Sequence, residues 1–203
     1  MTLLPMIVRW VKRSASSVYF HRCTANMSTN NRRLRVLVDM DGVIADFEGG
    51  FLKKYKARYP NEPYISLEDR RGFWVSTQYG DLRSDLCEKA ISIWESKNFF
   101  IELDPLPGGV EAVKEMSKME NTDIFICTSP IKHYSYCPYE KYAWIEKHLG
   151  LEFLEQIILT RDKTIVTGDI LIDDKPDILV KNYTTHNPEQ RSTNQRIRAC
   201  CCE

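Results

Sequence analysis

A short apolar run that ends in two aspartates constrains this chain more than any other feature. Residues 34–38 read Leu-Arg-Val-Leu-Val, and four of the five are apolar, which is typical of a strand buried on both faces of a parallel sheet. Asp39, Asp41 and Gly42 follow at once, and a glycine there allows a tight turn. Because the chemistry of open α/β sheets gathers at the carboxyl ends of strands, this stretch predicts a polar site after a first strand.

The same two aspartates have a simpler interpretation. Aspartate is a favoured residue at helix N-termini, so Asp39 and Asp41 could cap a helix that starts near Ala45. The choice depends on whether other strands end in polar residues that reach the same edge of the sheet.

Length and composition indicate one globular domain with room for a small insertion. The chain has 203 residues, of which 43% are hydrophobic and 28% charged. Its formal net charge is zero, which argues against a surface for a nucleic acid polymer, whereas a mononucleotide needs only a few cations in one pocket. The seven cysteines lack zinc-ligand spacing, and the four scattered ones outside the run at 200–202 are expected to be reduced thiols.

The N-terminal stretch differs in charge from the rest. Residues 1–35 contain seven Lys and Arg residues and no acid, and apolar residues recur along one helical face near the start. A basic, serine-containing stretch without acids predicts a mitochondrial transit peptide over residues 1–31 and a place in the matrix. The alternatives are a leader without order, or translation from Met27 with a cytoplasmic product. No apolar run reaches the ~18 residues that a membrane-spanning helix needs.

Strands and helices alternate after the first strand. We expect helices at 47–59, 81–96, 110–119 and 138–149, and further strands at 123–128, 157–159 and 170–174. This alternation predicts parallel βαβ units, hence a doubly wound α/β sheet. The expected division is a leader at 1–31, an α/β core at 32–46 and 105–180, a helical cap at 47–104, and a disordered tail at 181–203.

Three of the predicted strands end in polar residues. The pairs are Asp39/Asp41, Thr128/Ser129 and Asp173/Asp174, and Lys141 lies on the helix after the second pair. The carboxyl ends of parallel strands share one edge, where several carboxylates without a cation would repel one another. A hard divalent ion with oxygen ligands relieves that repulsion, and Mg²⁺ fits best.

These residues stand in the order found in a known superfamily. D-M-D-G-V at 39–43, C-T-S at 127–129, Lys141 and I-D-D at 172–174 resemble the haloacid-dehalogenase-type phosphohydrolases. Within them, the chain closely resembles the 5′(3′)-deoxyribonucleotidases over residues 34–178. The matching segments are 36–47, 70–75, 126–130, 140–142 and 159–164. Residues 73–75, Phe-Trp-Val, and the leader favour the mitochondrial type over the cytosolic one.

The resemblance implies an Mg²⁺-dependent phosphoric monoester hydrolase. Asp39 would be the nucleophile that forms an aspartyl-phosphate, and Asp41 the proton donor and base. The metal would be bound by the Asp39 carboxylate, the Asp41 backbone carbonyl and Asp173, with Asp174 orienting these ligands.

The resemblance also implies a phosphate site and a substrate pocket. Phosphate would be bound by Thr128, Ser129 and Lys141, and further contacts would come from Lys132, Arg161 and Lys163. The base and deoxyribose would be bound by Phe47, Phe73, Trp74 and Val75; ordinary packing of the helical insertion is the alternative for the aromatic pair. The implied substrates are deoxyribonucleoside monophosphates such as dTMP and dUMP, the implied role is control of mitochondrial deoxynucleotide pools, and the implied assembly is a homodimer.

The chain departs from the family after Asp177-Ile178. The family continues there with a further strand, a loop and a closing helix, whereas residues 181–203 are polar and without periodicity. The alternative expectation is therefore a poorly folded or inactive isoform that only binds nucleotide or pairs with full-length subunits.

Overall fold

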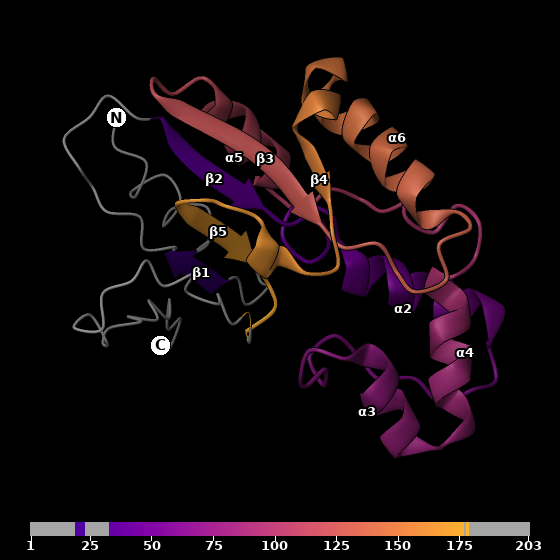
Figure 1. Ribbon diagram of the computed structural model, residues 1–203. Coiled ribbons are helices and arrows are strands. Elements are labelled where there is room, and N and C mark those ends of the chain that lie inside the picture. Colours follow the sequence, from indigo (N-terminus) through magenta and orange to yellow (C-terminus); the bar gives the residue numbers. More distant parts are fainter. Residues whose placement is uncertain (1–18, 23–32, 177, 179–203) are drawn as a thin grey trace, which may run out of the picture.

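The described part of the chain folds around a five-stranded sheet (Figure 1). The computed structural model describes residues 19–22, 33–176 and 178. The strands stand in the order β1-β5-β2-β3-β4. Four neighbouring strands run parallel to one another: β2 (Leu34–Val38), β3 (Thr122–Thr128), β4 (Ile157–Leu159) and β5 (Ile170–Asp173). This arrangement confirms the predicted α/β class with a parallel sheet.

Strand β1 (Tyr19–Arg22) is an unpredicted part of the sheet. It pairs antiparallel with β5 at the edge, and its backbone register joins Tyr19 to Asp173. It lies within residues 1–31, which were expected to be a leader outside the fold. Backbone pairing at a sheet edge needs no particular side-chain pattern, which explains why the sequence did not indicate it. The rest of the leader and the tail at 181–203 lie outside the described residues.

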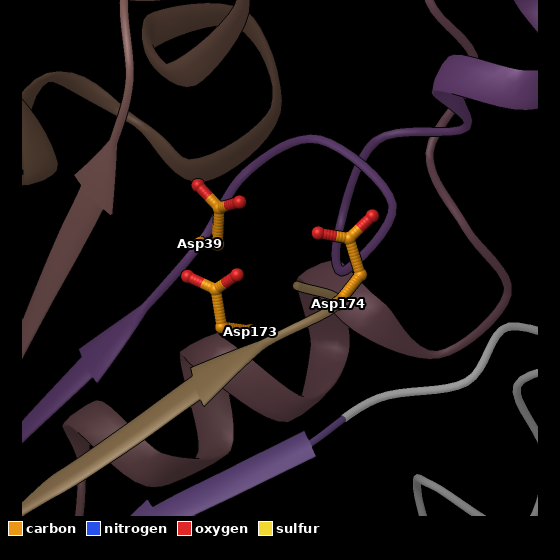
Figure 2. A group of neighbouring side chains, drawn as sticks. All are labelled: Asp39, Asp173 and Asp174. Atoms are coloured by element: carbon orange, nitrogen blue, oxygen red, sulfur yellow. The ribbon is translucent and has the colours of Figure 1, made fainter. Parts of the chain in front are cut away.

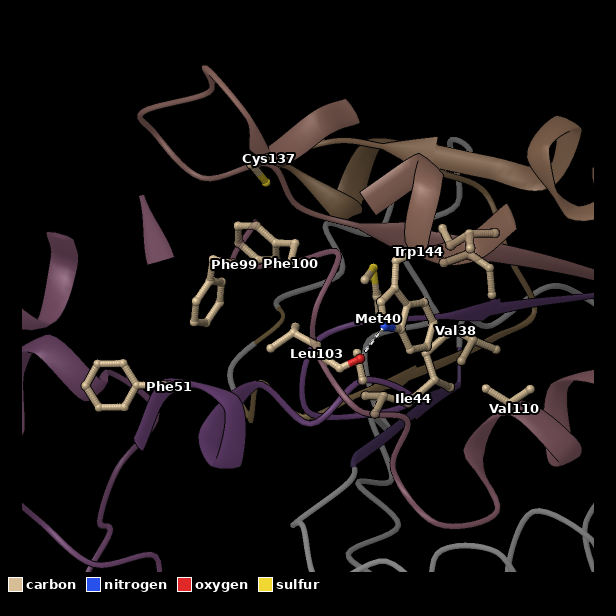
Figure 3. Packing of buried hydrophobic residues seen from close by; sticks show 14 of the residues in the cluster. Val38, Met40, Ile44, Phe51, Phe99, Phe100, Leu103, Val110, Cys137 and Trp144 are labelled. Carbon is tan, nitrogen blue, oxygen red and sulfur yellow. Dashed lines mark hydrogen bonds between the residues drawn. The ribbon is translucent and has the colours of Figure 1, made fainter. Parts of the chain in front are cut away.

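One face of the sheet carries the main core. Helices α5 (Gly109–Ser117) and α6 (Cys137–Leu149) both pack there, against side chains such as Val38 of β2. Trp144 of α6 is fully buried among them, and its indole N–H donates to the Leu103 carbonyl at 2.8 Å (Figure 3). A large aromatic ring whose one polar atom is satisfied fixes α6, and the residues it carries, against the strands.

The opposite face is covered differently. Leu37, Cys127 and Leu171 form a small cluster there, and the segment between β4 and β5, with the 3-10 turn η2 (Lys163–Ile165), returns across it. Among the described residues no α-helix covers this face. The chain thus winds outward from β2 to β4 and returns to β5 on the far side of β2, with a loop in place of the expected second layer of helices.

A helical insertion follows β2. It comprises α2 (Phe47–Arg58), α3 (Val75–Leu82) and α4 (Asp85–Trp94). Asp46 caps α2, since its carboxylate accepts from the Gly49 amide at 2.9 Å. The chain leaves and re-enters the core at one place, where the Asp46 amide donates to the Asp104 carbonyl at 2.8 Å.

The helix predicted at 81–96 is confirmed over Asp85–Trp94 as α4, but its first two residues, Asp81 and Leu82, end a separate helix, α3, that was not predicted. Extended backbone at Arg83 separates α3 from α4, and α3 begins at Val75. The two helices pack closely at Gly80, where an added Cβ would lie 3.2 Å from the Cys87 Cβ atom. Apolar residues at helical spacing do not reveal such a turn, because both helices bury the same kind of face.

The short turn η1 (Leu151–Gln156) joins α6 to β4. Within the described ranges, every helix is too short or too polar to cross a membrane.

Candidate active site

Three carboxylates meet at the carboxyl ends of the neighbouring strands β2 and β5 (Figure 2). The strand order reverses between these two strands. Asp39 follows β2, while Asp173 ends β5 and Asp174 comes next. Each offers an oxygen within 4.8 Å of the others, and Asp39 and Asp173 are buried. In open α/β sheets this switch point between neighbouring strands is where ligands bind.

The strand register brings Asp39 and Asp173 together. Val38 of β2 lies opposite Ile172 of β5, so the next residue of each strand reaches the same level. The Asp39 amide donates to the Ile172 carbonyl at 2.8 Å, which holds the chain as it leaves the sheet. The alternative that Asp39 and Asp41 cap a helix is not supported, because Asp46 caps α2.

The loop after Asp39 can turn only because it contains a glycine. Gly42 has φ +70°, and a Cβ added there would lie 2.2 Å from an Asp174 carboxylate oxygen. The glycine therefore serves both the left-handed backbone and the approach of Asp174 to the other carboxylates.

Asp41 faces the other side of the site, where it pairs with Lys141. The Lys141 ammonium lies 2.5 Å from Asp41 Oδ2 and donates to Thr128 Oγ1 at 2.7 Å and to the Ser129 carbonyl at 2.9 Å. The Lys141 side chain is completely buried. Because Thr128 accepts from the lysine, its own hydroxyl hydrogen stays available for an incoming oxygen.

Lys163 lies between two of the clustered carboxylates. Its ammonium is 2.8 Å from Asp39 Oδ1 and 2.5 Å from Asp173 Oδ2. Burial lowers the pKa of this lysine, but the charges of Asp39 and Asp173 outweigh burial and raise it above its usual value. Lys163 is therefore a permanent cation at the site.

Burial and mutual repulsion raise the pKa values of the acids. Burial, then the charge of Asp39, raises the pKa of Asp173 to about 6. Burial and the charges of Asp39, Asp173 and Asp41 raise the pKa of Asp174 well above its usual range. Burial also raises the pKa of Asp41, against the opposing effect of Lys141. Carboxyl groups crowded together in this way favour the binding of a positive ion beside them.

These residues fit a divalent cation with oxygen ligands. Among the described residues, the buried oxygens Asp39 Oδ1 and Asp41 Oδ1 receive no aligned hydrogen bond, although the first forms an ion pair with Lys163. Asp39, Asp173 and Asp174 supply carboxylate oxygens close enough to share one ion. Hard cations prefer such ligands.

Comparison with known proteins agrees with this geometry. The family model described as "5′ nucleotidase, deoxy (pyrimidine), cytosolic type C protein" matches residues 32–201. This match spans most of the chain. The chain belongs to the 5′(3′)-deoxyribonucleotidase family.

Curated members of the family include close relatives. The mitochondrial 5′(3′)-deoxyribonucleotidase of Homo sapiens is 75% identical over 72% of this chain and 64% of its own length. The mitochondrial enzyme of Mus musculus is 71% identical over 73% of this chain and 68% of its own. The cytosolic-type enzyme of Homo sapiens is 50% identical over 84% of this chain and 82% of its own. The chain thus spans just under two thirds of the length of the human mitochondrial relative.

The aromatic residues expected to form a substrate pocket fall into two groups in this deoxyribonucleotidase-family chain. Phe47 packs on Phe99 and Phe100, with ring centroids 5.3 and 6.4 Å apart. Phe73 and Trp74 form a separate pair, 4.8 Å apart and nearly perpendicular, and Trp74 is 60% exposed. The exposed Trp74 ring is not part of the packed core, which was the alternative for this residue.

The remaining candidates differ in position. Val75 is only 5% exposed and belongs to the hydrophobic core, and its contact with a base stays a prediction. Lys132 and Arg161 are exposed, and their contacts to substrate stay predictions. Ser129 contributes its backbone carbonyl to Lys141.

Sequence reasoning missed Glu140 as a residue with a role of its own. Its buried carboxylate accepts from the amides of Asn98 and Phe100, at the end of the insertion. The Phe100 ring in turn lies 5.0 Å from the Lys141 ammonium. In the sequence, its position next to the expected phosphate-binding lysine was the only indication of a role for this glutamate. Helix periodicity does not predict which backbone amides it binds.

Proposed function

We propose that the chain is an Mg²⁺-dependent 5′(3′)-deoxyribonucleotidase, a phosphoric monoester hydrolase that acts on deoxyribonucleoside monophosphates such as dTMP and dUMP. The observation that carries the proposal is the setting of Asp39. Its carboxylate lies beside the Lys163 ammonium and two further carboxylates, and Asp41 with its Lys141 partner follows two residues later.

Asp39 acts as the nucleophile. A carboxylate oxygen attacks phosphorus and the bond to the sugar oxygen breaks, which leaves an aspartyl-phosphate. Water then attacks this phosphorus, releases inorganic phosphate and restores the carboxylate. The ion pair with Lys163 holds Asp39 in one orientation at the strand end.

Asp41 moves the proton in both steps. Its raised pKa favours the protonated carboxyl that the leaving sugar oxygen needs. Once it has given that proton, the carboxylate accepts one from the attacking water. Oδ2 is paired with Lys141, while Oδ1 has no hydrogen-bond partner among the described residues and is the atom that exchanges the proton.

Cations must offset the repulsion between the phosphate and the carboxylates. Lys141 and Thr128 bind phosphoryl oxygens on one side, and Lys163 provides positive charge on the other. Asp39, Asp173 and Asp174, with the Asp41 carbonyl, would hold Mg²⁺. When bound, this ion neutralises part of the negative charge that builds up on the transferring group.

The deoxyribose and base are bound by Phe47, Phe73 and Trp74. An apolar and aromatic surface has no partner for a 2′-hydroxyl, so burying one there is unfavourable and deoxy substrates are preferred. The exposed Trp74 ring offers a stacking face for the base.

A mitochondrial location and a dimer complete the proposal. The basic, acid-free start of the chain supports import, and the higher identity to the mitochondrial relatives agrees with it. Fusion of the full chain to a fluorescent protein should label mitochondria, whereas the same fusion starting at Met27 should stay in the cytoplasm. Light scattering of the purified protein should give twice the chain mass of 23.7 kDa.

A phosphate-release assay tests the chemistry. The purified chain should hydrolyse dTMP faster than UMP, and both much faster than a hexose phosphate, with activity lost on chelation and restored by Mg²⁺. Asp39→Asn should be inactive, because an amide cannot act as the nucleophile. Equal rates on all three esters would reject the substrate assignment, and an active Asp39→Asn protein would reject the mechanism.

A further inference from the structure

Lys175 touches both the carboxylate end of the sheet and the aromatic loop of the insertion. It directly follows Asp173 and Asp174, and its backbone amide donates to Asp173 Oδ1 at 2.9 Å. Its ammonium lies 5.8 Å from the centroid of the Phe73 ring and 5.5 Å from that of Trp74. Both distances are in the range of attraction between a cation and a ring face.

Hydrogen bonds stabilise the loop that carries Phe73 and Trp74. Arg70 binds the Glu48 carboxylate with two nitrogens, each at 2.8 Å, and the Arg70 side chain is only 8% exposed. Gln78 accepts from the Arg71 amide and donates to the Asp69 carbonyl, both at 2.9 Å. The loop is thus fastened to the first turn of α2.

We propose that Lys175 is a positioning residue that docks the Phe73–Trp74 pair against the acidic end of the sheet and so sets the distance between the base pocket and Asp39. This inference rests on the proposed function and deepens it. The lysine belongs to the core and the rings to the insertion, so the contact joins the part that binds the base to the part that carries the nucleophile.

The attraction between Lys175 and the two rings depends on the positive charge of the lysine. Substitutions that keep or remove this charge can therefore distinguish it from simple packing. Arginine keeps the charge and stacks on rings, whereas methionine keeps an apolar stem of similar length without it. The chain also offers a matched control, because the Lys56 ammonium lies 4.1 Å from the Tyr64 ring centroid within the insertion.

The kinetic test compares Lys175→Met, Lys175→Arg and Lys56→Met on two esters. With dTMP, Lys175→Met should raise KM about fivefold with little change in kcat, since each exposed contact of this kind contributes a factor of about 2 to 5. With deoxyribose 5-phosphate, which has no base to place, KM should not change. Lys175→Arg should restore the dTMP value, and Lys56→Met should match the parent. An equal effect on both esters, or none on dTMP, would overturn the proposal.

A second measurement does not depend on turnover. Amide hydrogen exchange across residues 70–75 should speed up in Lys175→Met and return to the parent rate in Lys175→Arg, while Lys56→Met leaves it unchanged. If the protein hydrolyses no dTMP, the proposed function fails, but exchange still decides whether Lys175 docks the loop. Unchanged exchange in Lys175→Met would refute the docking role whatever the activity.

Discussion

Glu140 is a buried carboxylate on α6 whose loss should destabilise the fold. Its side chain is 3% exposed, Oε1 accepts from the Asn98 amide at 2.5 Å, and Oε2 accepts from the Phe100 amide at 3.0 Å. Asn98 has φ +68°, so the chain makes a tight left-handed turn as it leaves the insertion. One carboxylate on α6 therefore holds the end of the insertion to the core.

We expect Glu140→Gln to destabilise the protein by about 2–4 kcal/mol. Glutamine keeps the size of the side chain, but one of its two polar atoms is an NH2 group that cannot accept from an amide. One buried N–H then lacks a partner, which costs ~1–3 kcal/mol, and the other loses a charged acceptor. For a domain of this size each kcal/mol lowers Tm by roughly 2–4 °C, so the drop should be about 5–15 °C.

Thermal and urea unfolding measure this change. The urea midpoint should fall while the slope stays constant, since the surface exposed on unfolding is the same. Glu146→Gln is the matched control, because Glu146 is an exposed glutamate on the same helix, and its Tm should match the parent within about 2 °C. A Glu140→Gln protein as stable as Glu146→Gln would show that the two amides find other partners, and the reasoning would be wrong.

Three further predictions concern the site and the core. Gly42→Ala should lower kcat/KM at least tenfold and Tm by several degrees, because a Cβ at φ +70° collides with Asp174; activity and melting assays check both effects. In metal-free protein, Asp173→Asn should raise Tm above pH 6 and leave it unchanged near pH 4. The raised pKa of Asp173 means that its contribution to stability is complete below about 4 and is lost as pH rises through about 6, so a Tm difference at acidic pH would contradict it. Cys127 should resist alkylation in the native protein at pH 8, since burial raises the pKa of its thiol to about 12, whereas the less buried Cys87 should react; mass spectrometry of the alkylated peptides distinguishes them.

The strands and the acidic cluster could be predicted because their signals are local. An apolar run that ends in an acid marks both a buried strand and the position of a side chain at its end, as for Asp39 and Asp173. Parallel pairing then brings those ends together without further information. The left-handed turn at Gly42 was predictable for the same reason, since glycine after the two acids has few other uses.

Contacts between segments far apart in the sequence could not be predicted. Glu140 binds amides about forty residues earlier in the chain, and nothing in helix α6 indicates which loop will lie beside it. Lys163 was expected as a contact at the rim, yet it pairs with Asp39 and Asp173. The break between α3 and α4 was also missed, because the close approach at Gly80 leaves the apolar spacing unchanged.

The balance of charge predicts the order in which a divalent cation and a phosphate substrate would bind. With every group ionised, Asp39, Asp41, Asp173 and Asp174 carry four negative charges against the two positive charges of Lys141 and Lys163. A divalent ion would bring this total to zero and so remove the net negative charge of the site. A phosphate dianion that enters before the cation would meet a net negative site, whereas one that enters afterwards would meet a neutral site that includes Lys141 and the Thr128 hydroxyl. Binding of the metal should therefore precede productive binding of the substrate.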